Sequence, residues 1–356
     1  MPEEGVIMIQ VLEFDGWLRE QGVFEEESEE ESECPSSASC RKTVQDMKDH
    51  KNKLVSLKKG EQQCNDTTLD QAVQWVDFTT LEGTNGYCDA EAAAVITEKT
   101  ADGMRELHPV TWIGNGNYHY VTHLLTMQIK DPFSLVVLDH HPDMQPSFFA
   151  ELLSCGSWVL HALEHNPMLR QVILIGVKEE LLQALPENPD VVPVVMQGEL
   201  TEEAAESAGT ETLKELQKWK QAQYHDRKQC ESIRPSCLYQ FICHGKTVTA
   251  ISESFFQNVH DVSVLHTWIG KLVKAPLYLS VDKDVLCRED CITNWDSGSM
   301  KLSELLTLLE GVLCSHPVIG MDFCGESGEG SEPDALENNR SCNAQILQKL
   351  KEGFDV

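Results

Sequence analysis

The sequence predicts an α/β fold built on a mostly parallel sheet that is covered by helices on both faces. Four short runs of apolar, largely β-branched residues occur along the chain, each bounded by polar residues, Gly or Pro: 134–138, 172–177, 277–281 and 317–321. Helix-prone stretches separate these runs, notably 148–164 and 302–313. Continuous apolar strands that alternate with helices are typical of a parallel sheet buried on both faces.

The N-terminal part of the chain predicts further elements of such a fold. Residues 5–18 (GVIMIQVLEFDGWL) begin with an apolar, β-branched run and predict a first strand, or a strand and a turn. Residues 73–78 (VQWVDF) predict a strand, and residues 81–88 (LEGTNGYC) predict a Gly- and Asn-containing loop. The Ala- and Glu-rich residues 89–100 predict a helix, for which Asp89 is a suitable N-cap.

Two charged segments interrupt this pattern. Residues 25–33 hold seven Glu in nine positions, and residues 199–215 hold six Glu. Such blocks repel themselves and cannot bury a face, so they indicate solvated segments. For the first block, a metal-binding acidic segment is the alternative. We therefore predict a single domain over residues 1–356, with exposed insertions at about 20–64 and 198–245.

Composition excludes several classes of function and location. The 356 residues include 28 Lys and Arg against 58 Asp and Glu, a net charge of −30, which argues against nucleic acid or an anionic membrane as partner. An apolar run of the roughly 18 residues that a membrane span needs is missing. The first ten residues lack the pattern of a secretory signal. Without such a signal, 13 cysteines indicate thiols in a reducing compartment, so we expect a cytoplasmic protein.

The first chemical motif is VVLDHHPD at residues 136–143, where an apolar strand leads directly into acidic and imidazole side chains. Alternate residues of an extended segment share a face, so Asp139, His141 and Asp143 point the same way while His140 points elsewhere. These ligands would repel or desolvate one another without a cation. Their mixture of carboxylate and imidazole suits a divalent ion such as Mn²⁺.

The second motif, LYLSVDKDVL at residues 277–286, again ends an apolar strand in alternating acids, Asp282 and Asp284. In an open parallel sheet, ligands bind beyond the carboxyl ends of the strands, where the two motifs can face each other. Together they supply four carboxylates and one imidazole, which is too many for one ion and suits two. Two neighbouring metals can share a water and make it a hydroxide nucleophile near neutral pH.

Two further segments belong to this pattern. The loop at 112–120 (WIGNGNYHY) carries His119, which completes the ligands of the first metal, although His123 is close by in sequence. The strand end at 320–326 (GMDFCGE) presents Asp322 and Glu326. A lone Asp at a strand end is usually a cap or turn former, and a lone His is usually structural. Two acidic alternations after two fully apolar strands favour a metal site instead.

These motifs resemble those of the ureohydrolase superfamily (arginase, agmatinase and formiminoglutamase), which has a three-layer α/β/α fold and a binuclear manganese centre. The family's D-A-H-x-D motif matches residues 139–143, with His140 in place of the usual Ala. Its S-x-D-x-D motif matches residues 280–284, and its glycine-rich loop that ends in a ligand His matches residues 114–119. The similarity spans about residues 110–326 and implies an arginase-like fold.

The resemblance implies two Mn²⁺ ions per subunit. Their ligands would be six side chains: His119, Asp139, His141, Asp143, Asp282 and Asp284. Asp139 and Asp282 would bridge the ions, His119 and Asp143 would complete the ligands of one ion, and the remaining two would serve the other. The resemblance further implies a binuclear manganese hydrolase that acts on C–N bonds of linear amidines.

In the implied reaction, a metal-bridging hydroxide attacks the carbon of a guanidino or amidino group, and a C–N bond breaks after a tetrahedral intermediate. Asp284 would accept the proton of the nucleophile, and Glu326 or Asp322 would hold a cationic group of the substrate. The expected partner is a small cationic or guanidino substrate, and a second copy of the chain is a further candidate partner.

The sequence departs from the family pattern near the substrate. Cys155, before Gly156, stands where the family has a His in a His-Gly context, which makes this thiol a candidate for substrate binding or catalysis. The best register places Gly325, not Glu326, at the family's guanidinium-binding Glu. The D-P that follows the second acidic motif in the family is absent. These differences suggest a divergent bacterial arginase-like subgroup, whose substrate need not be arginine or agmatine.

Other cysteines fall in segments that are expected to surround the site: Cys88, Cys287, Cys291 and Cys324. Their ordinary interpretation is as small buried hydrophobic residues without reactivity, and the alternative is a thiol that contributes to substrate binding or catalysis.

Two other functions remain open at this level. A single-zinc deacylase resembling the histone deacetylases also uses an Asp-x-His strand end, although the S-x-D-x-D motif favours two ions. A non-catalytic metal-binding or regulatory protein that has kept the fold is the second alternative, and Cys155 and Gly325 are its best support.

Overall fold

The computed structural model describes residues 7–24, 71–106, 109–146, 152–201, 235–258, 262–273, 275–328, 332 and 334–354. The chain divides into two compact units, and all of these residues belong to the unit formed by residues 1–24 and 70–356. The other unit, residues 25–69, takes up most of the first predicted insertion and lies outside the described residues.

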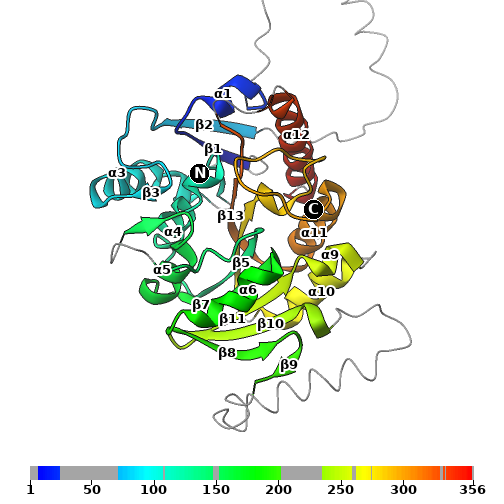
Figure 1. Ribbon diagram of the computed structural model, residues 1–356. Helices are drawn as coiled ribbons and strands as arrows, with labels where there is room; N and C mark the ends of the chain where they lie inside the picture. Colours follow the sequence, from blue (N-terminus) through cyan, green and yellow to red (C-terminus); the bar gives the residue numbers. More distant parts are fainter. Residues whose placement is uncertain are drawn as a thin grey trace, which may run out of the picture. The chain divides into compact units, whose positions relative to one another are not determined.

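A large sheet forms the centre of the described unit (Figure 1). Its strands are β1 (Ile7–Glu13), β2 (Gln71–Asp77), β4 (Val110–Trp112), β5 (Phe133–Leu138), β7 (Leu169–Val177), β8 (Val191–Met196), β9 (Glu199–Leu200), β10 (Leu238–Cys243), β11 (Lys246–Ser252), β12 (Leu277–Asp282) and β13 (Val318–Cys324). Their order is β2-β1-β4-β13-β12-β5-β7-β11-β10-β8-β9. Pairing is parallel from β2 through β11 and antiparallel from β11 to β9. Separately, β3 (Tyr87–Cys88) pairs with β6 (Leu153–Ser154).

The predicted strands are confirmed. The apolar runs at 134–138, 172–177 and 277–281 lie within β5, β7 and β12, and the run at 317–321 overlaps β13. Every residue of β5 and of β12 is buried, which is why these segments have no polar alternation. The predicted first strand and the strand at 73–78 correspond to β1 and β2.

Helices flank the sheet. The α-helices are α1 (Trp17–Gln21), α3 (Ala90–Thr100), α4 (Val121–Thr126), α5 (Trp158–His165), α6 (Glu179–Ala184), α9 (Ser254–Asn258), α10 (Ser263–Leu272), α11 (Leu302–Ser315) and α12 (Ala335–Phe354). In Figure 1, α3, α4 and α5 lie on one side of the sheet, and α10, α11 and α12 lie on the other. This arrangement of helices around a mostly parallel sheet confirms the predicted α/β architecture.

Three helix predictions can be compared directly, and the helix at 302–313 is confirmed as α11. The helix at 89–100 is confirmed as α3, and the Asp89 side chain caps it by accepting a hydrogen bond from the backbone N–H of Ala92 at 2.8 Å. The helix predicted over 148–164 is confirmed only in its second half, as α5. Leu153 and Ser154 form β6, and a turn follows before the helix begins, so the first half of that prediction is wrong where the structure describes it.

The predicted insertion at 198–245 also needs correction. Within it, β9 and β10 are strands of the sheet, and Tyr239 and Phe241 of β10 are fully buried. A two-residue turn joins β10 to β11, with His244 and Gly245 both at positive φ, as a type I′ hairpin requires. The prediction extended the exposed insertion from the acidic block at 199–215 through this hairpin and so missed its strands. Residues 202–234 lie outside the described residues.

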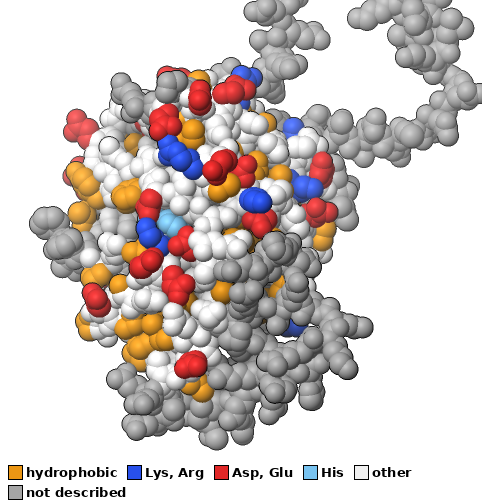
Figure 2. Space-filling model, turned by 45° about the vertical axis from the view of Figure 1, so that its right-hand side comes forward, with side chains coloured by type: hydrophobic (Ala, Val, Ile, Leu, Met, Phe, Trp, Pro, Cys, Tyr) orange, Lys and Arg blue, Asp and Glu red, His pale blue; other side chains and the backbone are white. Residues whose placement is uncertain are grey.

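Two further observations concern the described helices and one face of the surface. None of the described helices is both long enough and apolar enough to cross a bilayer. On the face shown in Figure 2, acidic side chains are dispersed among a few basic ones, and Lys and Arg do not gather there into a continuous patch.

Candidate metal centre

The carboxyl ends of β5 and β12 lie side by side, because these strands pair in parallel with Leu138 opposite Val281. Asp139 follows the first strand, and Asp282 ends the second. His119 reaches the same edge from the short helical turn η2 (Gly116–Tyr118), which follows β4 and precedes α4. Three segments far apart in the sequence thus bring their polar side chains to one edge of the sheet.

A first group of donor atoms surrounds His119. Its Nδ1 atom lies 3.1 Å from Asp139 Oδ2, 3.2 Å from Asp143 Oδ2 and 3.5 Å from Asp282 Oδ2. All four side chains are buried. We call His119, Asp139, Asp143 and Asp282 the His119 cluster.

The other ring nitrogen of His119 is fixed by a hydrogen-bond chain. Its Nε2 atom lies 2.9 Å from Ser280 Oγ, and Ser280 donates in turn to Asp322 Oδ1 at 2.7 Å. Because Ser280 has one proton and gives it to a carboxylate, Nε2–H of the imidazole must donate to Ser280. Nδ1 therefore faces the three carboxylates, which is the position from which it could bind a metal ion together with them.

Asp322 holds Ser280, the residue that orients His119, and does not hold a substrate group as predicted. Besides Ser280, it accepts hydrogen bonds from Thr122 at 3.0 Å and from the Tyr278 hydroxyl at 2.9 Å. The side chain is fully buried, and burial raises the pKa of its carboxyl to about 6. Its oxygens are occupied by these donors and do not line a cavity.

A second group of donor atoms surrounds His141. Its Nδ1 atom lies 2.8 Å from Asp284 Oδ2 and 3.6 Å from Asp139 Oδ1. Its Nε2 atom lies 2.9 Å from Asp296 Oδ1, and Lys178 donates to the other oxygen of Asp296 at 2.9 Å. We call His141, Asp139 and Asp284 the His141 cluster. Asp296 holds the Nε2–H of His141, so that Nδ1 is free to face the cluster.

The backbone of the two motifs is held by their own carboxylates. Asp139 Oδ1 accepts from the backbone N–H of His141 at 2.6 Å, and Asp282 Oδ1 accepts from that of Asp284 at 2.9 Å. Asp284 Oδ1 accepts from the backbone N–H of His140 at 3.0 Å. Each acid therefore keeps one oxygen on the chain and presents the other to a cluster.

Charge is crowded in both clusters. Burial, followed by the charge of Asp139, raises the pKa of Asp284 to about 7, and burial also raises the pKa values of Asp139, Asp143 and Asp282. Burial by itself would lower the pKa of His141, but hydrogen bonds to Asp139 and Asp284 raise it to about 12. Burying several charged carboxylates so close together costs free energy unless a cation neutralises their charge.

Two observations show that the donors fit metal ions. His119 Nδ1 and Asp139 Oδ2 are buried and have no hydrogen-bond partner, although they lie only 3.1 Å apart. Two ligand atoms that are each about 2.1 Å from one ion stand roughly 3.0 to 3.5 Å apart for ordinary coordination angles. The spacings around His119 Nδ1 fall in this range. The structure thus brings all six predicted metal ligands together in a His and Asp cluster that is compatible with a metal site, with His141 partly exposed and the other five buried.

A cavity of about 270 Å³ opens beside the two clusters. Its lining consists of Gly86, Gly116, Asp139, His141, Pro142, Asp143, Gln145, Ser154, Cys155, Gly156, Asp282, Asp284 and Trp295. Cys155 is therefore at the cavity, where the sequence predicts it. Burial raises the pKa of its thiol to about 11, so the group is neutral near pH 7.

Glu326 is not at this cavity. Its carboxylate is fully buried, forms an ion pair with Lys283, and accepts hydrogen bonds from Gln21 at 2.8 Å, Asn343 at 2.8 Å and Asn339 at 3.2 Å. The prediction that Glu326 holds a cationic substrate group is therefore wrong for this structure. The sequence did not reveal that Lys283, which alternates with the two acids of its motif, points away from them and requires a buried counter-ion.

Gly325 has a structural reason to be glycine. Its φ is +85°, and a Cβ placed there would lie 2.3 Å from Asp282 Oδ1 and 2.5 Å from the backbone nitrogen of Lys283. A side chain at this position would push the second motif out of place. Gly325, which departs from the family pattern, is therefore the residue that allows the end of β13 to approach Asp282 closely.

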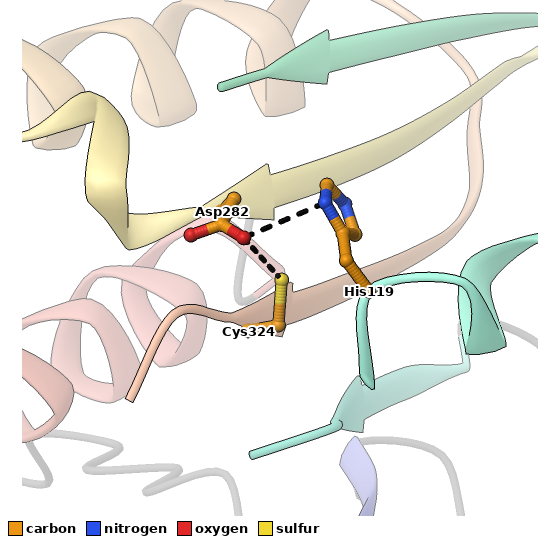
Figure 3. Close-up of side chains that lie close together, drawn as sticks. All are labelled: His119, Asp282 and Cys324. Carbon is orange, nitrogen blue, oxygen red and sulfur yellow. Dashed lines mark hydrogen bonds and ion pairs between the residues drawn. The ribbon is translucent and has the colours of Figure 1, made fainter. Parts of the chain in front are cut away.

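Two residues beside the clusters were not assigned from the sequence. Cys324 Sγ lies 3.2 Å from Asp282 Oδ2, as Figure 3 shows. Its alternation with Asp322 along β13 was a usable signal, since alternate residues share a face. Asp296 lies in an irregular loop and had no comparable signal.

Replacing Asp296 by Ala is expected to weaken Mn²⁺ binding at the His141 cluster by about 10- to 100-fold, the usual cost of removing a group that orients a ligand His. Isothermal titration calorimetry of the metal-free protein measures this change. Lys178→Ala is the matched control, because it removes the ion pair to Asp296 but leaves the acceptor of His141. Unchanged Mn²⁺ affinity in Asp296→Ala would contradict this role.

No family model matches the sequence. A Thermotoga maritima protein, described as uncharacterized, is 25% identical over 250 residues, which cover 68% of this chain and 67% of that protein.

Solved structures show the fold. The proclavaminate amidino hydrolase of Streptomyces clavuligerus matches 99% of this chain and 92% of its own, with a TM-score of 0.54 and 14% identity. The arginase of Bacillus subtilis matches 98% of both chains, with a TM-score of 0.54 and 10% identity. The formimidoylglutamase of the same bacterium matches 99% of this chain and 88% of its own, with a TM-score of 0.52 and 12% identity. The chain therefore shares an arginase-like α/β fold with these proteins, as the sequence predicts.

Proposed function

We propose that this chain is a two-metal hydrolase that cleaves a C–N bond of a small guanidino or amidino compound, with Mn²⁺ as the ion that the sequence motifs imply. The observation that carries the proposal is the pair of adjoining donor clusters beside one cavity. The fold supports it, because the solved structures that share it are named as an amidino hydrolase, an arginase and a formimidoylglutamase.

The residues would divide between two ions that share Asp139. The four buried carboxylates of the clusters carry as much negative charge as two divalent cations carry positive charge, so occupation of both positions would relieve their repulsion. Bound there, the ions would lower the pKa of a shared water toward neutrality and polarise the group under attack. His119 and His141 are already oriented for this by Ser280 and Asp296.

The remaining chemistry is assigned to side chains of the cavity. Asp284 lines it and has one oxygen 2.8 Å from His141 Nδ1, so we propose that it accepts a proton from the attacking water. Every carboxylate on the described lining belongs to a cluster. Substrate groups would therefore be recognised by the neutral hydrogen-bonding side chains Gln145, Ser154 and Cys155. Because these groups are neutral, we expect a substrate that carries no second strong positive charge besides its guanidino or amidino group.

The alternatives receive less support. A single-zinc deacylase needs one ligand set, whereas the described residues form one set around His119 and another around His141. A purely structural or regulatory metal site needs no access for small molecules, whereas both motifs line the cavity.

An activity screen tests the proposal. The full chain is loaded with Mn²⁺ and incubated with a panel of guanidino, amidino and formimino compounds, and released urea, ammonia and amine are measured. Turnover of at least one compound, lost after chelation and restored by Mn²⁺, is the expected result. Failure on the whole panel, and on a parallel panel of amides, with two ions bound would favour the non-catalytic alternative.

Metal addition is expected to stabilise the protein. At a free Mn²⁺ concentration a hundred times the Kd, a single site raises the free energy of unfolding by about 2.7 kcal/mol. Thermal denaturation with EDTA and with added Mn²⁺ measures the change. Mg²⁺ at the same concentration is the control for ionic strength, because a site with imidazole ligands favours Mn²⁺ over Mg²⁺. An identical Tm with and without Mn²⁺ would argue against metal binding by the folded state.

A further inference from the structure

Cys324, the last residue of β13, lies against the His119 cluster. Its Sγ is 3.2 Å from Asp282 Oδ2. With a ring nitrogen of His119 and a carboxylate oxygen of Asp282 it forms a group of three donor atoms, each within 4.8 Å of the other two. Figure 3 shows the three side chains directed toward one another from β12, β13 and the segment that carries His119. All three are buried.

The end of β13 lies close to this cluster because the residue after Cys324 is a glycine. Gly325, directly after Cys324, lets the backbone pass where a Cβ would lie 2.3 Å from Asp282 Oδ1. The side chain before it, Phe323, packs against Trp112 in the core, so Cys324 faces the opposite way, toward Asp282. The thiol is therefore held at the cluster by the strand and not by a loop.

We propose that Cys324 is a further ligand of the ion bound by the His119 cluster, so that this position binds a thiophilic divalent ion such as Zn²⁺ in preference to Mn²⁺. The inference rests on the metal centre of the proposed function and changes the ion expected at one of its two positions. On binding, the S–H bond breaks, its proton passes to solvent, and the thiolate sulfur donates an electron pair to the ion. Neither partner is oxidised or reduced.

An unpartnered nitrogen beside the thiol supports a role for Cys324 as a metal ligand and not only as a hydrogen-bond donor to Asp282. Asp282 Oδ2 is 3.2 Å from Sγ and 3.5 Å from His119 Nδ1, so an ion bound to Asp282 and His119 lies within reach of the sulfur. His119 Nδ1 is buried, has no hydrogen-bond partner, and is aimed into this space. An ion that takes this nitrogen and Asp282 Oδ2 as ligands would therefore have the sulfur beside it.

The sulfur would distinguish the two positions chemically. Thiolate ligands select softer ions such as Zn²⁺, whereas carboxylates and water suit Mn²⁺. The donor group around His141 contains imidazole and carboxylates but no sulfur among the described residues. The two positions are therefore expected to differ in metal preference.

Cobalt provides a direct probe of this ligand. The metal-free full chain is loaded with Co²⁺, its metal content is measured by mass spectrometry, and its near-ultraviolet absorption is recorded. The wild type is expected to show a thiolate-to-Co²⁺ charge-transfer band. Cys324→Ser should bind Co²⁺ without the band. Cys155→Ser, which removes the described thiol lining the cavity, should keep it.

Competition between Zn²⁺ and Mn²⁺ gives a second readout. Cys324→Ser is expected to reduce the preference for Zn²⁺ over Mn²⁺ at the His119 cluster by about tenfold or more. Removing a group that only orients a metal ligand already costs about tenfold or more in metal affinity. An unchanged preference would contradict the inference. Cys324→Ala replaces Cys324→Ser if the hydroxyl variant does not fold, as judged by circular dichroism.

The possible failures are distinguishable. Wild-type protein that binds Co²⁺ without a charge-transfer band overturns Cys324 as a ligand and leaves the proposed metal centre standing. A wild type that binds no Co²⁺, Zn²⁺ or Mn²⁺ overturns both. Because the wild-type spectrum decides the first point, the test does not depend on the folding of a variant.

Discussion

Replacing Asp139 and Asp282 together by Asn is expected to abolish metal binding and to lower kcat/KM by at least about 10³-fold. Each carboxylate faces His119 Nδ1, at 3.1 and 3.5 Å, and Asp139 also faces the His141 cluster. An amide cannot supply the charge that holds two divalent ions. A loss of roughly 4 kcal/mol of metal-derived transition-state stabilisation corresponds to about a thousandfold in rate. Metal content and the rate on the best compound of the activity screen measure the effect.

The same variant should be at least as stable as the metal-free wild type. Burial raises the pKa values of both carboxyls, which means that their charged forms are disfavoured in the folded protein. Removing those charges relieves repulsion when no cation is present. Denaturation of both metal-free proteins checks this point. A variant that retains two ions or wild-type turnover would refute the assignment of Asp139 and Asp282 as ligands.

Replacing Lys283 by Met is expected to destabilise the fold by about 3–5 kcal/mol, because it leaves the buried charge of Glu326 without a partner. Both side chains are fully buried, and Lys283 also donates to Asn343 of α12 at 2.8 Å. The pair thus connects the second acidic motif to the C-terminal helix. Urea denaturation of the metal-free protein measures the change apart from any effect on metal binding.

Two controls define the origin of that loss. In Lys283→Met with Glu326→Gln, the total cost should be at least about 1 kcal/mol smaller than the sum of the two single costs, as expected for coupled partners. Lys349→Met removes a less buried lysine that pairs with Glu310 and Glu352. Its cost should stay within about 1 kcal/mol, the range of surface ion pairs. Equal costs for Lys283→Met and Lys349→Met would contradict the special role of the buried pair.

The acidic pairs at the strand ends were predictable because of how parallel sheets are built. A strand buried on both faces must be continuously apolar, and the carboxyl ends of neighbouring parallel strands meet at one edge. From these rules, the runs before Asp139 and Asp282 indicated that both acids lie at one edge of the sheet. Alternation along segments that were expected to be extended then added Asp143, His141 and Asp284. In the structure Asp284 lies in a 3-10 turn (Lys283–Val285) and Asp143 has a φ of +48°, so these side chains reach the site by turns of the backbone.

Side chains whose role depends on partners from other elements were harder to predict. Glu326 was assigned to the substrate because it follows a strand of the same sheet, yet its partners come from Gln21, Lys283 and α12. Nothing local to β13 distinguishes a carboxylate that turns into the cavity from one that turns toward a buried lysine. Asp296 was missed for the same reason, since its partner His141 is 155 positions away in the chain.

The sequence by itself determined the α/β class, the strands β5 and β12, and the clustering of four acids at their ends, because burial on both faces and the two-residue repeat of a strand are local properties. The tertiary structure decided which acids face the cavity, which imidazole nitrogen is presented, and that Cys324 lies beside Asp282. The first two features depend on segments more than a hundred residues apart in the chain. The position of Cys324 depends on a glycine that lets two strand ends approach each other, 42 positions apart.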